Sequence, residues 1–131
     1  MRLFLIISFL FTGSYLVAGD TTEARVAKPK LLYGTASYYS NSFNGKKTAN
    51  GEIYSHKKMT AACNVLPLGT WIRVTNLRNR KSVVVKTNDR LHTRMKRVVD
   101  LSREAADKLD YVKAGLTKVR VEVIGKKKPE K

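Results

Sequence analysis

The clearest strand signals of this chain lie in 70-TWIRVTNLRNRKSVVVKTNDR-90. Its first part, 70-TWIRVTN-76, contains tryptophan, isoleucine and valine, and its later part, 81-KSVVVKT-87, contains three successive valines. Runs of β-branched and aromatic residues of this length indicate strands. The intervening 76-NLRNR-80 is polar and carries two asparagines, which is typical of a hairpin turn. The sequence therefore predicts a β-hairpin over these residues.

Two further strands and one helix are expected after this hairpin. Residues 97–101 (RVVDL) indicate a third strand, and valines alternate with charged residues in 117-TKVRVEVIG-125, as in a half-buried strand. Between them, Ser102 can cap a short helix that ends before Gly115. The segment 40-SNSFNGKKTANGE-52 is expected to be a long loop, and such loops on a β scaffold often carry function. The pattern predicts a mainly β domain with one helix.

The termini indicate an exported, single-domain protein. Residues 1–19 have a basic start, a short apolar run and small residues at their end, which is typical of a secretory signal peptide. Residues 20–30 are expected to be a linker, 31–124 the domain, and 125–131 a basic disordered tail. Signal cleavage leaves no membrane span and no cysteine for a lipid anchor. The protein is therefore expected in the periplasm or cell envelope.

The charge and the cysteine content narrow the class of partner. A net charge of +16, from 26 Lys and Arg against 10 Asp and Glu, favours an anionic partner. An exported protein rarely meets nucleic acid, so envelope polymers and membrane headgroups are the expected partners. The single cysteine, Cys63, excludes an internal disulfide and can be a small buried hydrophobe. His56 and His92 are far apart in sequence and do not by themselves make a metal site.

Two carboxylates stand at positions where functional groups are common. Glu52 lies in the long loop, and Asp89 lies at the end of a strand. Paired carboxylates are the usual means of cleaving a glycosidic bond, because one of them must protonate the leaving oxygen. Each also has a structural interpretation, Asp89 as a turn residue paired with Arg90 and Glu52 as a solvated loop charge. Asp100 precedes Ser102 and is expected to serve helix capping.

Six segments of the domain, which run in order over about ninety residues, form a specific set of motifs. They are 34-GTASYYS-40, 43-FNGKKTANGE-52, 59-MTAACNVLPLGTWIRVTNLRN-79, 83-VVVKTNDR-90, 97-RVVDLSREAADKL-109 and 114-AGLTKVRVEV-123. Together they resemble the rare lipoprotein A (RlpA) family of septal lytic transglycosylases. The resemblance implies a six-stranded double-psi β-barrel in an exported protein that acts on peptidoglycan.

The activity that the resemblance implies is endolytic cleavage of denuded glycan strands between N-acetylmuramic acid and N-acetylglucosamine. The muramic acid's own hydroxyl closes an anhydro ring as the bond breaks, and neither a metal nor another cofactor is required. Division-septum proteins are the further partners that the resemblance implies.

The resemblance also assigns roles to residues. The catalytic carboxylate falls on Asp89 and a second acidic pocket residue on Glu52. A carboxylic acid held protonated in a partly apolar groove can donate to the glycosidic oxygen and then, once ionised, accept a proton. The substrate-binding residues that it implies are Tyr39, Thr48, Asn50, Cys63, Asn88 and Arg90.

Two departures from the family pattern keep other functions open. Cys63 stands where the family usually has a pocket histidine, and Leu91 and His92 replace the Gly-Pro of an NDRGP segment. A thiol donates hydrogen bonds only weakly. The alternative is therefore a non-catalytic, expansin-like module that binds peptidoglycan. A third hypothesis is an envelope-surface binder driven by charge, whose binding would collapse at moderate salt.

Overall fold

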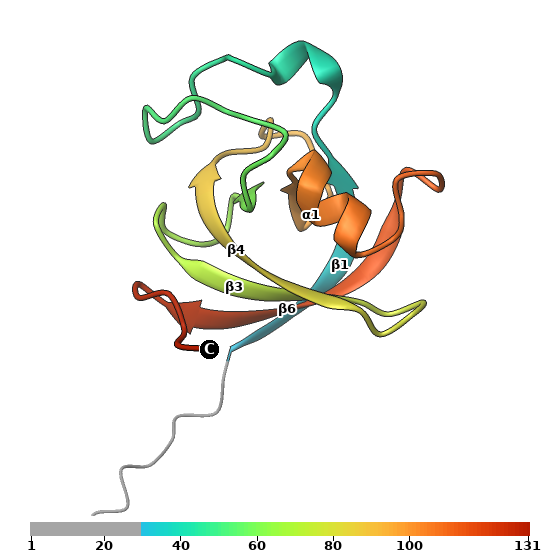
Figure 1. Ribbon diagram of the computed structural model, residues 1–131. Coiled ribbons are helices and arrows are strands. Elements are labelled where there is room, and N and C mark those ends of the chain that lie inside the picture. Colours follow the sequence, from blue (N-terminus) through green and yellow to red (C-terminus); the bar gives the residue numbers. More distant parts are fainter. Residues whose placement is uncertain (1–29) are drawn as a thin grey trace, which may run out of the picture.

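The structure, a computed structural model, describes residues 30–131 and contains a closed six-stranded β-barrel (Figure 1). The order of strands around the barrel is β1-β5-β2-β4-β3-β6. Within these residues the prediction of a mainly β fold with six strands and one short α-helix is confirmed. The predicted signal peptide, 1–19, lies outside the described residues. The elements are β1 (Leu31–Tyr38), the 3-10 helix η1 (Asn41–Phe43), β2 (Thr60–Ala62), β3 (Trp71–Asn76), β4 (Ser82–Asp89), β5 (Val99–Leu101), α1 (Arg103–Lys108) and β6 (Thr117–Gly125).

The barrel combines antiparallel and parallel strand pairs. The predicted hairpin is present, because β3 and β4 pair antiparallel with Thr75 opposite Ser82. β1 pairs parallel with β5, and β2 pairs parallel with β4. β2 also pairs antiparallel with β5. These pairings place the last residues of β1 and β2 on either side of β5, and the end of β4 next to the end of β2, at one end of the barrel.

The interior of the barrel is filled by side chains that alternate along the strands. On β6, Val119 and Val121 are fully buried, as the alternation of valine with charged residues predicts. Val83 and Val85 are buried in the same way on β4. The remaining buried members of the core cluster are Ala36, Ala61, Cys63, Leu66, Ile72, Val74, Val99, Leu101, Ala105, Ala106, Leu109 and Tyr111.

The strand pattern of the sequence does not by itself predict β1 or β2. β1 contains Gly34, and a side chain there would clash, because a Cβ atom would lie 2.9 Å from the Cβ of Val98. Glycine in a strand marks this kind of close approach. The three residues of β2 are all buried, so they show no alternation between polar and apolar positions.

The segment before α1 differs in detail from the expectation. The strand predicted from Arg97 begins at Val99. Arg97 instead donates through Nε and Nη2 to the two carboxylate oxygens of Asp100, at 2.8 and 3.1 Å. Asp100 is therefore not the helix cap. Ser102 is, as expected, and its hydroxyl accepts a hydrogen bond from the backbone N–H of Ala105.

Asn76, the last residue of β3, links three parts of the fold. Its side chain is 1% exposed, and its amide nitrogen donates to the carbonyl of Leu109, just after α1, at 2.9 Å. Its amide oxygen accepts from the backbone N–H of Arg78 and from the hydroxyl of Thr117 on β6. The bond to Thr117 is buried, so removing the amide leaves the hydroxyl of Thr117 unpaired inside the protein and takes away one of the two donors to the Leu109 carbonyl.

Asn76→Ala is expected to lower the free energy of unfolding by about 2 kcal/mol or more, because each buried polar group left unpaired costs about 1–3 kcal/mol. Asn79→Ala is the matched control, since exposed Asn79 donates to the same Leu109 carbonyl. It is expected to cost less than about 1 kcal/mol. Urea unfolding followed by circular dichroism measures both. Equal losses in the two variants would contradict the linking role of Asn76.

Candidate active site

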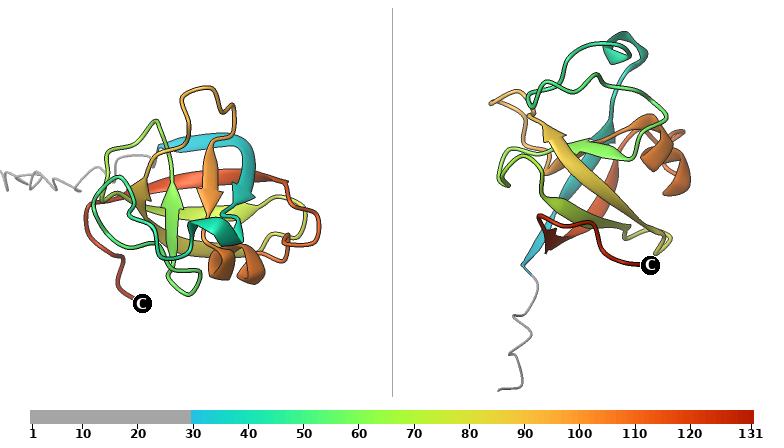
Figure 2. Two further views of the ribbon diagram at one scale, coloured as in Figure 1. Left: turned by 90° about the horizontal axis from the view of Figure 1, so that it is seen from above. Right: turned by 60° about the vertical axis from the view of Figure 1, so that its left-hand side comes forward.

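An open groove of about 580 Å³ lies where β1, β2 and β4 end. Figure 2 shows that the loops after β1 and after β4 both project from this end of the barrel. The groove volume falls in the range of about 300–1000 Å³ that is common for ligand sites. The lining residues are Tyr38, Tyr39, Ser40, Phe43, Ala62, Asp89, Arg90, Leu91, His92, Met95, Arg97 and Asp100.

A β-bulge at the end of β4 turns Asp89 toward the groove. Ala61 of β2 lies opposite Thr87, but Ala62 lies opposite Asp89, so Asn88 is an extra residue on β4. Alternate residues of β4 face the core up to Thr87, and an unbroken alternation would turn Asp89 inward as well. The bulge instead leaves Asn88 1% exposed and Asp89 half-buried at the groove.

Three hydrogen-bond donors fix the carboxylate of Asp89. Its Oδ1 accepts from the backbone N–H groups of Ala49 and Arg90, both at 2.9 Å, and its Oδ2 accepts from the hydroxyl of Tyr39 at 2.5 Å. A carboxylate oxygen offers about two acceptor sites. Oδ1 is therefore fully used, whereas Oδ2 keeps a site for a ligand in the groove.

The loop segment 48-TANGE-52 forms a tight turn that supplies one of these donors. The amide oxygen of Asn50 accepts from the hydroxyl of Thr48 at 2.7 Å and from the backbone N–H of Glu52 at 3.0 Å. The backbone N–H of Asn50 donates to the carbonyl of Asn88 at 3.1 Å, which docks the turn on β4. Thr48, Asn50 and Asn88 do not line the groove. They hold its edge in place.

Glu52 lies beside the groove rather than in its lining. The side-chain amide of Asn50 donates to its Oε1, and Lys86 Nζ lies 3.4 Å from the same atom. The hydrogen bond from Asn50 is the main cause that lowers the pKa of Glu52, and the charge of Lys86 adds to it. Glu52 is therefore a fixed, paired negative charge at neutral pH. Its side chain is 37% exposed, so Glu52 is a partly solvated loop charge that is also paired with Lys86.

Tyr39 is packed into an aromatic cluster and is only 8% exposed. Its ring stacks on Tyr54 with a centroid distance of 4.1 Å, and Phe43 meets its edge at 5.5 Å. Burial, and then the hydrogen bond to Asp89, raise the pKa of Tyr39 above its usual range. The hydroxyl therefore stays protonated and remains a donor. Little of the ring is open for stacking on a sugar.

Cys63 lies in the core cluster, and 1% of it is exposed. Its backbone N–H donates to the carbonyl of Asp89 at 3.0 Å, which continues the pairing of β2 with β4. A thiol buried in this way has no route to a sugar in the groove. The placement favours the interpretation of Cys63 as a small buried hydrophobe over that of a substrate contact.

Arg90 stabilises the loop after β2. Its Nη1 donates to the carbonyl oxygens of Cys63 and Leu66, so its side chain does not pair with Asp89, contrary to the structural interpretation of these neighbours. Leu91, in the place of a family glycine, is 8% exposed. It packs in a second apolar cluster with Tyr39, Tyr54 and Ala62.

Asp100 and Arg97 line the groove, and sequence analysis missed both as site residues. Ala62 lies opposite Asp89 on one side and opposite Asp100 on the other. The two aspartates are thus two strands apart, with their backbones about 10 Å from each other. The hydrogen bond to Asp100 raises the pKa of Arg97. One sequence pattern could have indicated Asp100 as a groove residue. It lies between two apolar residues of a strand, and the alternation of side chains along a strand turns it away from the core.

The two histidines occupy different places. His92 is exposed and lines the groove, whereas His56 is half-buried and its Nδ1 lies 2.8 Å from the hydroxyl of Tyr54. Among residues 30–131, no three His, Cys, Asp or Glu side chains are close enough together to hold a metal ion. No helix in the same range is long and apolar enough to cross a membrane.

The relatives that this chain matches are named for one enzymatic activity. Residues 32–121 match the protein family described as lytic transglycolase. The chain is 48% identical over 111 residues to the endolytic peptidoglycan transglycosylase RlpA of Pseudomonas aeruginosa, and 47% identical over 112 residues to that of Campylobacter jejuni. These matches cover 84% and 85% of this chain but only 33% and 41% of the two relatives.

Solved structures show the same fold at low sequence identity. The Streptomyces papain inhibitor superposes with a TM-score of 0.60 at 18% identity, covering 72% of this chain and 94% of that one. An expansin of Clavibacter michiganensis superposes with a TM-score of 0.58 at 21% identity, covering 78% of this chain and 53% of that one. At these identities the likeness concerns the fold alone.

The closed mixed barrel with a groove at one end is a double-psi β-barrel, as its structural neighbours also are. Within that class, the chain belongs to the RlpA family of lytic transglycosylases, because the family match spans nearly the whole barrel and the relatives are close to half identical. The resemblance drawn from the sequence motifs is confirmed.

Asn50→Ala is expected to raise the pKa of Glu52 toward its ordinary value, because the hydrogen bond from Asn50 is the main cause of the lowering. Lys86→Gln is expected to raise it less. A lowered folded-state pKa stabilises the fold above the ordinary glutamate pKa, and this contribution is lost as pH falls through the folded-state value. Carboxyl carbon shifts followed by NMR across the acidic range measure the change. An unaltered pKa in Asn50→Ala would contradict this account.

Proposed function

We propose that this chain is an endolytic lytic transglycosylase that cleaves the glycan strands of peptidoglycan. The observation that carries the proposal is Asp89, whose carboxyl group is oriented by three donors and opens through one oxygen onto a groove. The names and the sequence identity of the relatives support it. The bond cut joins N-acetylmuramic acid to N-acetylglucosamine in a denuded strand, as the family resemblance implies.

Asp89 acts first as general acid and then as general base. Its carboxyl proton, carried on Oδ2, passes to the glycosidic oxygen while the bond from that oxygen to the anomeric carbon of muramic acid breaks. A hydroxyl of the same muramic acid attacks this carbon and closes the anhydro ring. The proton of that hydroxyl returns to Asp89. One bond forms for the one that breaks, the carboxyl group is regenerated, and no water is consumed.

The surroundings of Asp89 suit this chemistry. Phe43, Leu91 and Met95 give the groove an apolar wall that limits the water competing with the sugar hydroxyl. Tyr39 orients Oδ2 through a hydroxyl that stays protonated. On the far side of Ala62, Asp100 and its partner Arg97 offer hydrogen bonds to sugar hydroxyls.

Glu52 and the turn around it position the acid rather than transfer protons. The carboxylate of Glu52 is tied to Asn50 and Lys86 beside the groove. The same turn presents the backbone N–H of Ala49 to Asp89. We assign Thr48, Asn50 and Asn88 to this positioning role as well, and Arg90 to holding the adjoining loop.

Export to the periplasm or cell envelope forms part of the proposal, because peptidoglycan lies there. It rests on the signal peptide predicted for residues 1–19. Division-septum proteins as partners remain a prediction from the family resemblance.

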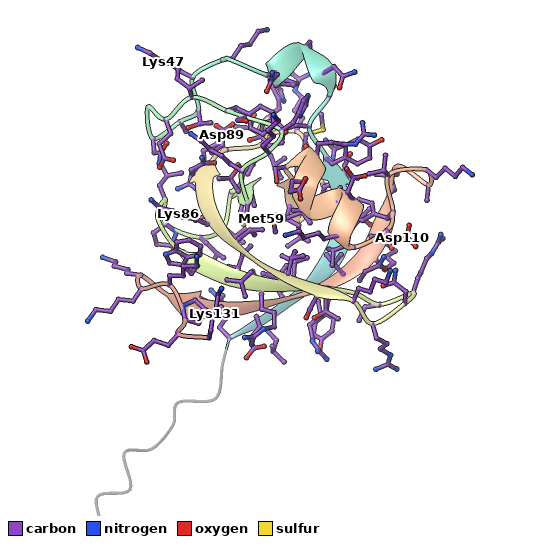
Figure 3. The ribbon with its side chains drawn as sticks, in the orientation of Figure 1. Lys47, Met59, Lys86, Asp89, Asp110 and Lys131 are labelled. Carbon is purple, nitrogen blue, oxygen red and sulfur yellow. The ribbon has the colours of Figure 1, made fainter. Side chains whose placement is uncertain are left out.

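Asp89→Asn is expected to lower the release of anhydro-ended products by at least about a hundredfold, since general acid–base groups contribute about 10²–10⁴ to rate. The substrate is denuded glycan, and mass spectrometry of the products measures the release. Asp110→Asn is the matched control, because Asp110 is exposed and lies far from Asp89 (Figure 3). It should retain full activity.

The outcomes separate the three candidate functions. Full activity of Asp89→Asn would remove Asp89 from the mechanism. Binding of denuded glycan by the wild type and by Cys63→His alike, with no anhydro products from either, would favour the expansin-like binding module. Binding that collapses at moderate salt whatever the groove residue changed would favour the charge-driven surface binder.

Tyr39→Phe is expected to lower kcat about tenfold, with little change in KM. The variant keeps the ring stacked on Tyr54 but removes the donor to Oδ2 of Asp89, and one hydrogen bond to a charged group is worth about 1.5–3 kcal/mol. The pH profile of kcat is expected to shift as well. Tyr54→Phe is the control for altered packing, because its hydroxyl contacts His56 and Arg103 instead. Equal kinetic effects of the two variants would refute the role of Tyr39.

A further inference from the structure

A second hollow, of about 390 Å³, adjoins the groove that contains Asp89. The two share three lining residues, Tyr38, Tyr39 and Ser40, which form a ridge between them. A polymer that crosses this ridge can fill both hollows at once, as a single sugar cannot. The second hollow is thus placed to hold a part of the ligand that lies away from the bond being cut.

The lining of the second hollow is polar and carries one positive charge. Beyond the shared ridge it consists of Ser37, Asn41, Arg103 and Gly115. Hydroxyl and amide groups suit hydrogen bonds to a sugar. Arg103 is the only charged residue of this lining, so the hollow favours a sugar that bears an anionic group.

Arg103 is held in place while much of its hydrogen-bonding capacity stays open. It is the first residue of α1, which lies beside the end of β1 in Figure 1. Its guanidinium carbon lies 5.7 Å from the centroid of the Tyr38 ring, whose hydroxyl is fixed by a 2.9 Å hydrogen bond to the carbonyl of Val112. Stacking of this kind pre-orients a guanidinium group.

The one ion pair of Arg103 within residues 30–131 is loose. Its Nε lies 3.7 Å from a carboxylate oxygen of the exposed Asp107, beyond hydrogen-bond distance, and this buried Nε has no hydrogen-bond partner there. The N–H groups of the planar guanidinium group can donate two parallel hydrogen bonds to the two oxygens of a ligand carboxylate in the hollow.

We propose that this second hollow is a distal sugar subsite in which Arg103 binds the lactyl carboxylate of a muramic acid residue. This inference rests on the proposed function. The glycan backbone of peptidoglycan has one intrinsic anionic group, the lactyl carboxyl of muramic acid, and it is ionised only where no stem peptide is attached through an amide. Arg103 therefore selects strands that are free of peptide at the sugar beyond the ridge.

The test compares two soluble glycan substrates that differ only at the lactyl group. One is peptide-free glycan with free lactyl carboxylates, and the other is the same glycan with those groups converted to methylamides. For the wild type, KM is expected to be at least about tenfold lower for the free carboxylate, since charge-assisted bonds are about twice as strong as neutral ones. Arg103→Gln is expected to lose this preference and to keep most of its kcat.

Two variants control the experiment. Lys108→Gln removes a charge from the same helix, at an exposed position outside both hollows, and should keep the wild-type preference. Arg103→Lys keeps the charge but not the fork, and should restore part of the preference. Thermal unfolding verifies that each variant is folded. Retention of the full preference by a folded Arg103→Gln would overturn the subsite.

Failure of the proposed function gives a different result. If the wild type releases no anhydro products from either glycan, the transglycosylase proposal fails, and direct binding decides the subsite. Fluorescence polarisation of labelled glycan fragments should then show tighter binding of the free carboxylate by the wild type, and no such difference in Arg103→Gln. Equal binding of both glycans by the wild type would overturn the subsite even when the enzyme is active.

Discussion

The docking of the turn 48-TANGE-52 onto the bulged end of β4 is the contact on which the site depends. Two backbone donors of the turn, from Ala49 and Asn50, reach Asp89 and the carbonyl of Asn88. The bulge makes Asn88 the buried extra residue and turns Asp89 to the groove. This register shift and these two hydrogen bonds fix the turn against the barrel and orient the carboxylate at the same time.

The candidate site contains one carboxylate fixed by three donors, Asp89, rather than two equivalent carboxylates in one pocket. Glu52 is paired with Lys86 and accepts a hydrogen bond from Asn50, so its charge stabilises the turn. Asp100, tied to Arg97, faces the groove from the other side of β2. An ion pair that is already satisfied can offer hydrogen bonds to a sugar without presenting an uncompensated charge to the reacting carbon.

The lone cysteine gains a plain structural explanation from its surroundings. Cys63 fills core space next to the β2–β4 pairing, and the contacts that orient Asp89 come from Tyr39 and from backbone N–H groups. Orientation of the acid in this chain therefore does not depend on an imidazole at that position. A small apolar side chain at position 63 is compatible with this orientation of Asp89.

Local patterns of apolar and turn-forming residues were enough to predict the hairpin, the strand over 117–125 and the capped helix. The barrel and the candidate acid Asp89 were predicted from the resemblance of the motifs to a known family. The sequence pattern did not predict β1, because Gly34 interrupts it. It did not predict β2 either, because the three residues of this strand are all buried and show no alternation of polar and apolar positions. Only the tertiary structure decided that Asp89 faces out and that Glu52 and Cys63 lie outside the groove. The exclusion of Glu52 and Cys63 from the groove follows from contacts with partners distant in the sequence, Lys86 for the first and the barrel core for the second. The outward direction of Asp89 follows from strand register, since one extra residue at Asn88 reverses the direction of the side chain that follows it, and no local sequence pattern encodes that partner-dependent shift.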